Sequence, residues 1–141
     1  MKVSTRNVFS GKVAKVTKGA VNAEVHLTVQ GGDQIVASIT NSSVDALALK
    51  EGVPAIALVK ASWVILGKGL EAAKISTRNV VSGTVSKILP GAVNSEVSVK
   101  LAGGAILTAI VTNGSVQHLH LVAGEQVSVA FKASSVIIAV E

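Results

Sequence analysis

The segment STRNVFSGKVAKVTKGAVNAEVHLTV at residues 4–29 decides the fold, because it returns as STRNVVSGTVSKILPGAVNSEVSVKL at residues 76–101. The correspondence continues without a gap to the end of the sequence. Aligning residues 4–69 with residues 76–141 gives 30 identities in 66 positions. Repetition at a fixed spacing indicates one structural unit used twice. The sequence therefore predicts two similar domains rather than one larger one.

The junction between the two copies reads GKGLEAAK at residues 67–74, with two glycines and two lysines. Such a composition is typical of a solvated connection. We therefore expect a first domain at residues 1–67, a linker at 68–74 and a second domain at 75–141.

Each copy has the pattern of a small β-barrel. Residues 8–15 alternate between two faces, as a strand does. Gly11 and its equivalent Gly83 interrupt this strand, which predicts a bulge or a tight bend. Gly31-Gly32-Asp33 predicts a hairpin, and Thr40-Asn41-Ser42-Ser43 predicts the start of a short helix. The order β-β-β-short α-β-β predicts an all-β protein of two tandem five-stranded Greek-key barrels of the OB type, each with one short helix.

The composition excludes several classes of protein. The 141 residues include no Cys, 49% are hydrophobic, and only 15% are charged, with a formal net charge of +5. Disulfide scaffolds and thiol chemistry are therefore excluded. The longest apolar run, Val53–Val59, is far shorter than the roughly 18 residues of a membrane span. We expect a soluble cytoplasmic protein with no membrane partner, and the hydrophobic surplus predicts burial in an oligomer.

Nothing in the sequence predicts catalysis. The polar residues shared by the two copies include no His, no Cys and no pair of carboxylates, so they offer no general base to activate a nucleophile. His118 and His120 are tempting as metal ligands, but Ala46 and Ala48 take their places in the first copy. We therefore expect a non-enzymatic protein in which no side chain binds a metal ion directly.

The shared polar residues are instead mostly hydrogen-bond donors suited to an anion. Arg6 and Lys60 supply charge, and hydroxyls and backbone N–H groups surround them. Ser43 stands at the predicted helix start, and the Gly19–Asn22 turn can offer backbone N–H groups to an oxyanion. A purely structural reading of Ser43 as a cap and of Asn22 as a turn residue remains open. Because Ser4, Arg6, Lys60 and Ser62 include no acceptor carboxylate, we hypothesise a preference for molybdate, tungstate or sulfate over phosphate.

Four motifs in order, each present twice, closely resemble the molybdenum-pterin-binding (Mop) domain: STRN at 4–7, KGAVNAEV at 18–25, ITNSSV at 39–44 and KASxVI at 60–65. Two such domains in tandem are similar to the di-Mop molbindins. The resemblance implies an OB-type barrel, a homotrimer, and molybdate or tungstate held between domains for intracellular storage and homeostasis.

The resemblance also implies which residues hold the oxyanion. In the first copy they are Ser4, Thr5, Arg6, Asn7, Ser43, Lys60, Ala61 and Ser62; in the second, Ser76, Thr77, Arg78, Asn79, Ser115, Lys132, Ala133 and Ser134. A second kind of site near the trimer axis would involve Ala20, Val21, Asn22, Ala92, Val93 and Asn94.

Two other functions compete with oxyanion binding. The positive charge favours a nucleic-acid-binding OB module, but such modules stack bases on aromatic side chains, and only Phe9, Trp63 and Phe131 are present. The same scarcity argues against a stacked pterin, so we expect neither a pterin nor a nucleic-acid partner. The remaining alternative is a structural assembly domain without a ligand.

Overall fold

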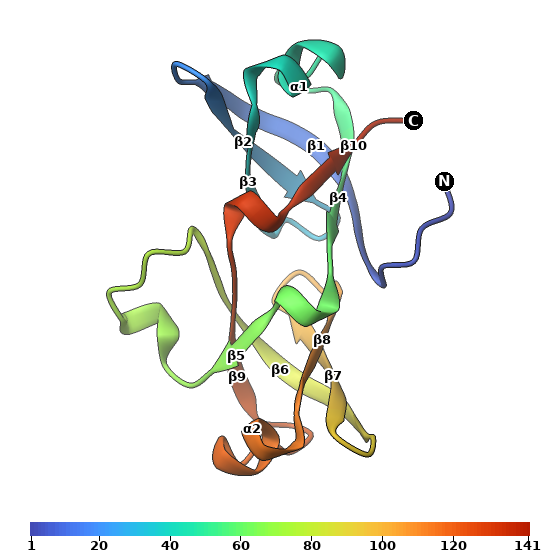
Figure 1. Cartoon of the computed structure of the whole chain (residues 1–141), viewed down its shortest axis with the longest axis vertical. Helices are drawn as coiled ribbons and strands as arrows, with labels where there is room; N and C mark the ends of the chain where they lie inside the picture. Colours follow the sequence, from blue (N-terminus) through green and yellow to red (C-terminus); the bar gives the residue numbers. More distant parts are fainter.

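Two curled antiparallel sheets of five strands each lie end to end along the long axis of the molecule (Figure 1). The computed structural model describes residues 1–141. The strand order is β10-β4-β1-β2-β3 in the first sheet and β5-β9-β6-β7-β8 in the second. The strands are β1 (Asn7–Lys18), β2 (Asn22–Val29), β3 (Gln34–Thr40), β4 (Pro54–Val59), β5 (Ile65–Gly67), β6 (Asn79–Pro90), β7 (Asn94–Leu101), β8 (Ile106–Thr112), β9 (Gln126–Phe131) and β10 (Ile137–Ala139).

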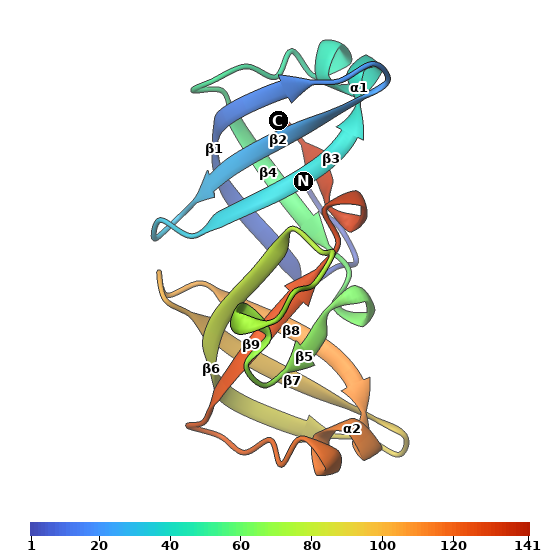
Figure 2. The ribbon, with the colours of Figure 1, turned by 90° about the vertical axis from the view of Figure 1, so that its left-hand side faces the viewer.

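Each sheet carries one short α-helix at its outer end, and three single 3-10 turns complete the structure (Figure 2). The helices are α1 (Asn41–Ala46) and α2 (Asn113–His118), and the 3-10 turns are η1 (Ala61–Trp63), η2 (Leu70–Ala72) and η3 (Ala133–Ser135). No helix in the structure is long and apolar enough to cross a membrane. The predicted all-β class, with five strands and one short helix in each unit, is confirmed.

The two sequence repeats exchange their last strands. Strand β5 belongs to the first repeat but pairs with β9 of the second, and β10 pairs in return with β4 of the first. Lys60 and Val64 are both extended on either side of η1, so the chain continues into the other half instead of reversing. The sheets therefore do not coincide with the predicted domains, because residues 65–67 lie in the second sheet.

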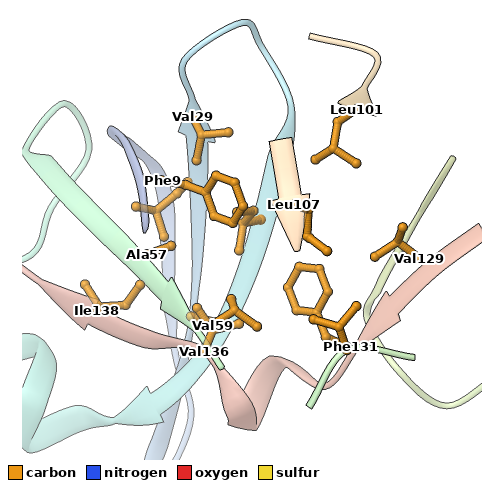
Figure 3. Packing of buried hydrophobic residues seen from close by; sticks show 14 of the residues in the cluster. Phe9, Val29, Ala57, Val59, Leu101, Leu107, Val129, Phe131, Val136 and Ile138 are labelled. Atoms are coloured by element: carbon orange, nitrogen blue, oxygen red, sulfur yellow. The ribbon is translucent and has the colours of Figure 1, made fainter. Parts of the chain in front are cut away.

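A single hydrophobic core runs through both halves. It contains 27 buried residues, and Figure 3 shows side chains of the two repeats meeting there, including Phe9 and Val59 from one repeat and Leu107 and Phe131 from the other. The core arises from the alternation in the strands: in β2, for example, every second residue from Ala23 to Val29 is buried. The two halves therefore form one continuous body.

The glycine in β1 has a different role from the one predicted. A Cβ atom at Gly11 would lie 2.2 Å from the carbonyl oxygen of Thr28, so the glycine allows two strands to approach closely. The register shift of β1 occurs instead between Val13 and Lys15, and that of β6 occurs between the equivalent residues. The strand is irregular, as predicted, but the bulge follows the glycine rather than including it.

Candidate oxyanion-binding site

A pocket of about 580 Å³ gathers the two segments that the sequence singles out. Register explains why: Asn7 on β1 pairs with Val59 on β4, so the residues before Asn7 and after Val59 lie side by side. The hydroxyl of Thr5 donates to the carbonyl oxygen of Val59 at 2.8 Å and fixes the loop. The lining residues are Val3, Ser4, Thr5, Arg6, Leu58, Lys60, Ala61, Ser62, Trp63, Ile110 and Ile137.

The second repeat builds the same local arrangement. Asn79 on β6 pairs with Phe131 on β9, and the hydroxyl of Thr77 donates to the carbonyl oxygen of Phe131 at 2.6 Å. The segment Ser76–Arg78 therefore lies beside the segment Lys132–Ser134. Each repeat thus brings one arginine, one lysine and several hydroxyls together.

Each arginine of these sites pairs with a glutamate from the opposite repeat. Arg6 contacts the carboxylate of Glu96, and Arg78 contacts that of Glu24. Both arginine side chains remain more than half exposed. The sequence predicts a site of donors alone, and this expectation is wrong in one respect, because a carboxylate lies against each arginine. An anion at either site must share the arginine with that carboxylate or displace it.

Glu24 has a further partner that Glu96 lacks. The Nε2 atom of His26 lies 2.7 Å from the Oε1 atom of Glu24, whereas Ser98 takes the place of His26 beside Glu96. The hydrogen bond from His26, followed by the charge of Arg78, lowers the pKa of Glu24 below its ordinary value. The two arginines are therefore paired with carboxylates in different surroundings.

Asn7 and Asn79 hold the two halves together. The Nδ2 atom of Asn7 donates to the carbonyl oxygen of Thr108 at 2.7 Å, and the N–H of Thr108 donates back to Oδ1 at 2.7 Å. Asn79 makes the same pair of bonds with Val36, at 2.7 and 2.8 Å. Both asparagines are buried, so their amides are not free to bind an oxyanion. The side-chain amides of these two residues therefore join the two halves, and the ligand role that the Mop resemblance implies for Asn7 and Asn79 stays a prediction.

The predicted serines at the helix starts do not line this pocket, although Ser115 lines a second pocket that shares Ile110 with it. Ser43 stands on α1 at the outer end of the first sheet, whereas η1 lies near the middle of the molecule (Figures 1 and 2). Its N–H and hydroxyl bond to Thr40, which is the actual cap of the helix. Ser115 bonds to Thr112 in the same way at the opposite end. A single chain therefore does not bring Ser43 or Ser115 to its own arginine–lysine pair.

The turns predicted as a second site also lie at the outer ends. The N–H of Gly19 donates to the carbonyl oxygen of Asn22 at 2.7 Å, and Asn41 bonds to this turn through its side chain and its N–H. The equivalent turn of the second repeat has the same bonds. Both turns are exposed to solvent, and the exposed fractions of Val21 and Val93 are 70% and 71%. The residues Ala20, Asn22, Ala92 and Asn94 accompany them on the surface.

Several residues of the pocket carry no signal in the sequence. Ile110 and Ile137 come from the second repeat: Ile137 reaches the pocket because β10 pairs with β4, and Ile110 because η1 packs against β8. Trp63 is not repeated, yet the Nζ atom of Lys60 lies 5.7 Å from the centre of its ring. The structure contains no cluster of three or more His, Cys, Asp or Glu side chains able to hold a metal ion.

The fold and the site define a class: a tandem pair of small β-domains whose paired loops present cations and hydroxyls suited to a small anion. The TOBE-domain family matches residues 3–66 and again residues 75–138. The chain therefore belongs to the TOBE-domain family, and its resemblance to tandem Mop-type proteins is confirmed.

Known proteins extend this relationship over the full sequence. The cytoplasmic molybdate-binding protein ModG, in a form with molybdate bound, is 44% identical with a TM-score of 0.95, and each chain covers 100% of the other. The molybdenum transport protein ModE of Herbaspirillum seropedicae is 40% identical over 100% of this chain and 52% of its own length. The molybdenum-pterin-binding protein MopA of Rhodobacter capsulatus is 40% identical over 99% of this chain and 52% of its own length. The chain thus spans about half the length of these two curated relatives.

Proposed function

We propose that the protein is a non-catalytic, cytoplasmic molybdate- and tungstate-binding protein that serves molybdenum storage and homeostasis. One observation carries the proposal: the pocket joins Ser4, Thr5 and Arg6 to Lys60 and Ser62. The likeness to ModG, a protein described with molybdate bound, supports the same ligand.

The chemistry of the pocket suits a tetrahedral dianion. Lys60 and Arg6 provide two positive charges, and the hydroxyls of Ser4 and Ser62 are further donors. A unit charge 4 Å from an opposite charge gains about 4 kcal/mol at an effective dielectric constant near 20. Glu96 opposes this gain at Arg6, so Lys60 is the cation that such an anion contacts without competition from a carboxylate.

We further propose that the site is completed by assembly, in the homotrimer that the Mop resemblance implies. The pocket of about 580 Å³ would hold roughly 20 water molecules at their bulk volume, far more than one tetrahedral oxyanion occupies. Large apolar side chains such as Ile65 and Ile137 are about half exposed close to it. A neighbouring copy that covers these side chains could also supply Ser43 or Ser115, which do not line this pocket in their own chain.

Titration calorimetry with sodium molybdate, together with elemental analysis and the mass of the assembly in solution, tests the proposal. We expect molybdate and tungstate to bind more tightly than phosphate, a preference that now rests on Lys60 and the hydroxyls of Ser4 and Ser62, since Glu96 lies against Arg6. Arg6→Ala and Lys60→Ala should each weaken binding about 10- to 100-fold, the effect of losing one charged hydrogen bond. Lys12→Ala is the matched control, because Lys12 is an exposed lysine on β1 outside the pocket.

Unchanged molybdate affinity in both the Arg6 and Lys60 variants would refute the site. A salt-dependent complex with single-stranded DNA, and none with molybdate, would instead favour the nucleic-acid-binding alternative.

A further inference from the structure

The two copies of the site have equivalent positions in the fold but different walls. The 3-10 turn η1 packs against β8, and η3 packs against β3. Register confirms the equivalence: Glu96, the partner of Arg6, pairs with Ile110, and Glu24, the partner of Arg78, pairs with Ser38. Three wall positions change from apolar to small or hydroxyl-bearing between the first site and the second: Trp63 to Ser135, Leu58 to Ala130 and Ile110 to Ser38.

The largest of these differences acts on the cation that binds the anion. The ammonium group of Lys60 lies over the Trp63 ring, with Nζ 5.7 Å from the ring centre, which is within the range of a cation–π interaction. The ring therefore orients Lys60 before a ligand arrives. Lys132 has only Ser135 at the same position, and a serine side chain offers no such interaction.

The apolar wall also changes the cost of removing water from an anion. Trp63, Leu58 and Ile110 form an apolar wall on one side of Lys60, which itself remains exposed, and an anion held against this wall loses part of its water and is attracted more strongly by the ammonium. Moving the anion out of water also costs hydration free energy, and this cost is greater for a smaller ion of the same charge. Sulfate is smaller than molybdate and is more strongly hydrated, so the apolar wall disfavours sulfate in particular.

We propose that Trp63 is a specificity-determining residue that makes the two sites of each chain unequal: the first site binds molybdate more tightly and rejects sulfate more strongly than the second. This inference rests on the proposed function, because it concerns the same pair of sites. It assigns the selectivity to one side chain present in only one repeat, while Arg6, Lys60 and their equivalents supply attraction at both sites.

The test uses the full chain, with sodium molybdate and sodium sulfate as probes. Calorimetry on the unaltered protein should resolve two classes of molybdate site, and molybdate should change the fluorescence of Trp63, the single tryptophan. Trp63→Ser should reduce the preference of the tighter class for molybdate over sulfate by about tenfold and bring the two classes together. Trp63→Phe, which keeps a ring over Lys60, should retain most of that preference.

The reciprocal change, Ser135→Trp, should strengthen sulfate rejection at the second site, and it tests the proposal even if Trp63→Ser lowers stability. Val122→Ser is the matched control, because Val122 is an apolar residue with 51% exposure on the loop before β9. An unchanged molybdate-to-sulfate ratio in Trp63→Ser and Ser135→Trp, with molybdate binding intact, would overturn this inference alone. No molybdate binding by the unaltered protein would overturn the proposed function and this inference with it.

Discussion

The paired asparagine amides provide the sharpest test of how the two halves are joined. Asn7 is fully buried and bridges to β8, an edge strand of the other sheet, through two hydrogen bonds of 2.7 Å. An edge strand presents unpaired N–H and C=O groups, and the amide satisfies one of each. Replacing Asn7 with Ala removes the amide and leaves both groups of Thr108 without a partner.

The magnitude follows from the burial of these groups. Thr108 is 8% exposed, so neither orphaned group has ready access to solvent. Each buried polar group left unsatisfied costs about 1–3 kcal/mol. With partial relaxation, we expect Asn7→Ala to lower the free energy of unfolding by about 3 kcal/mol. For a chain of this size the melting temperature should fall by roughly 10 °C.

Equilibrium unfolding in urea, followed by circular dichroism, measures the loss. Asn79→Ala should cost the same within about 1 kcal/mol, since its bonds to Val36 are equivalent. Asn41→Ala is the control. The side-chain amide of Asn41 donates an exposed hydrogen bond to the carbonyl oxygen of Gly19, so removing it should lower the free energy of unfolding by about 1 kcal/mol or less. If Asn7→Ala costs no more than Asn41→Ala, the amide bridges do not hold the halves together.

Two further changes test local features. Gly31→Ala should lower the free energy of unfolding by about 3 kcal/mol, because φ is +90° and the new Cβ would lie 2.1 Å from the carbonyl oxygen of Gly103. Gly32→Ala should lower it by about 1 kcal/mol, because φ is +97° but no atom lies close to the new Cβ. Equal losses of stability in thermal melts would contradict the close packing of the two hairpins. The lowered pKa of Glu24 means that its ion pair stabilises the fold above the pKa of the unfolded chain and is lost as Glu24 takes up a proton. As the pH is lowered past about 4.3, the melting temperature of Glu24→Gln should therefore decrease less steeply than that of the unaltered protein. Parallel plots of melting temperature against pH would refute a contribution from this carboxylate.

Strand positions and fold class could be predicted because they depend on local alternation. The pattern of β2, with Val25 and Leu27 buried and the residues between them partly exposed, is legible in the sequence. The exchange of β5 and β10 between the sheets could not be predicted from the sequence, because each strand is only three residues long and its local pattern is the same whichever sheet it joins. Which sheet a strand enters depends on the direction of the chain after η1, and no residue type determines that direction uniquely.

The candidate site could be predicted in part for the same reason. Arg6 and Lys60 are brought together by strand register, and their recurrence at equivalent positions of the second repeat marks them. Glu96 and Ile110 come from the other repeat, so their place near the site depends on tertiary contacts that the sequence does not encode locally. The Mop resemblance implies Asn7 as a ligand residue, and recurrence in the second repeat does not show that its side chain is engaged in the fold, because structural and binding residues recur alike.

The position of Asn7 directly after Arg6 bears on how the proposed site would exchange a ligand without loosening the junction of the two halves. Arg6 is more than half exposed, and its partner Glu96 belongs to the opposite repeat, so an anion that binds Arg6 competes with one contact between the halves. The next residue makes a contact of a different kind: the Asn7 amide is neutral, fully buried and bonded to backbone atoms that no anion can reach. An anion bound at the proposed site would therefore weaken the exposed ion pair, while the buried bridge of Asn7 keeps the two halves in place.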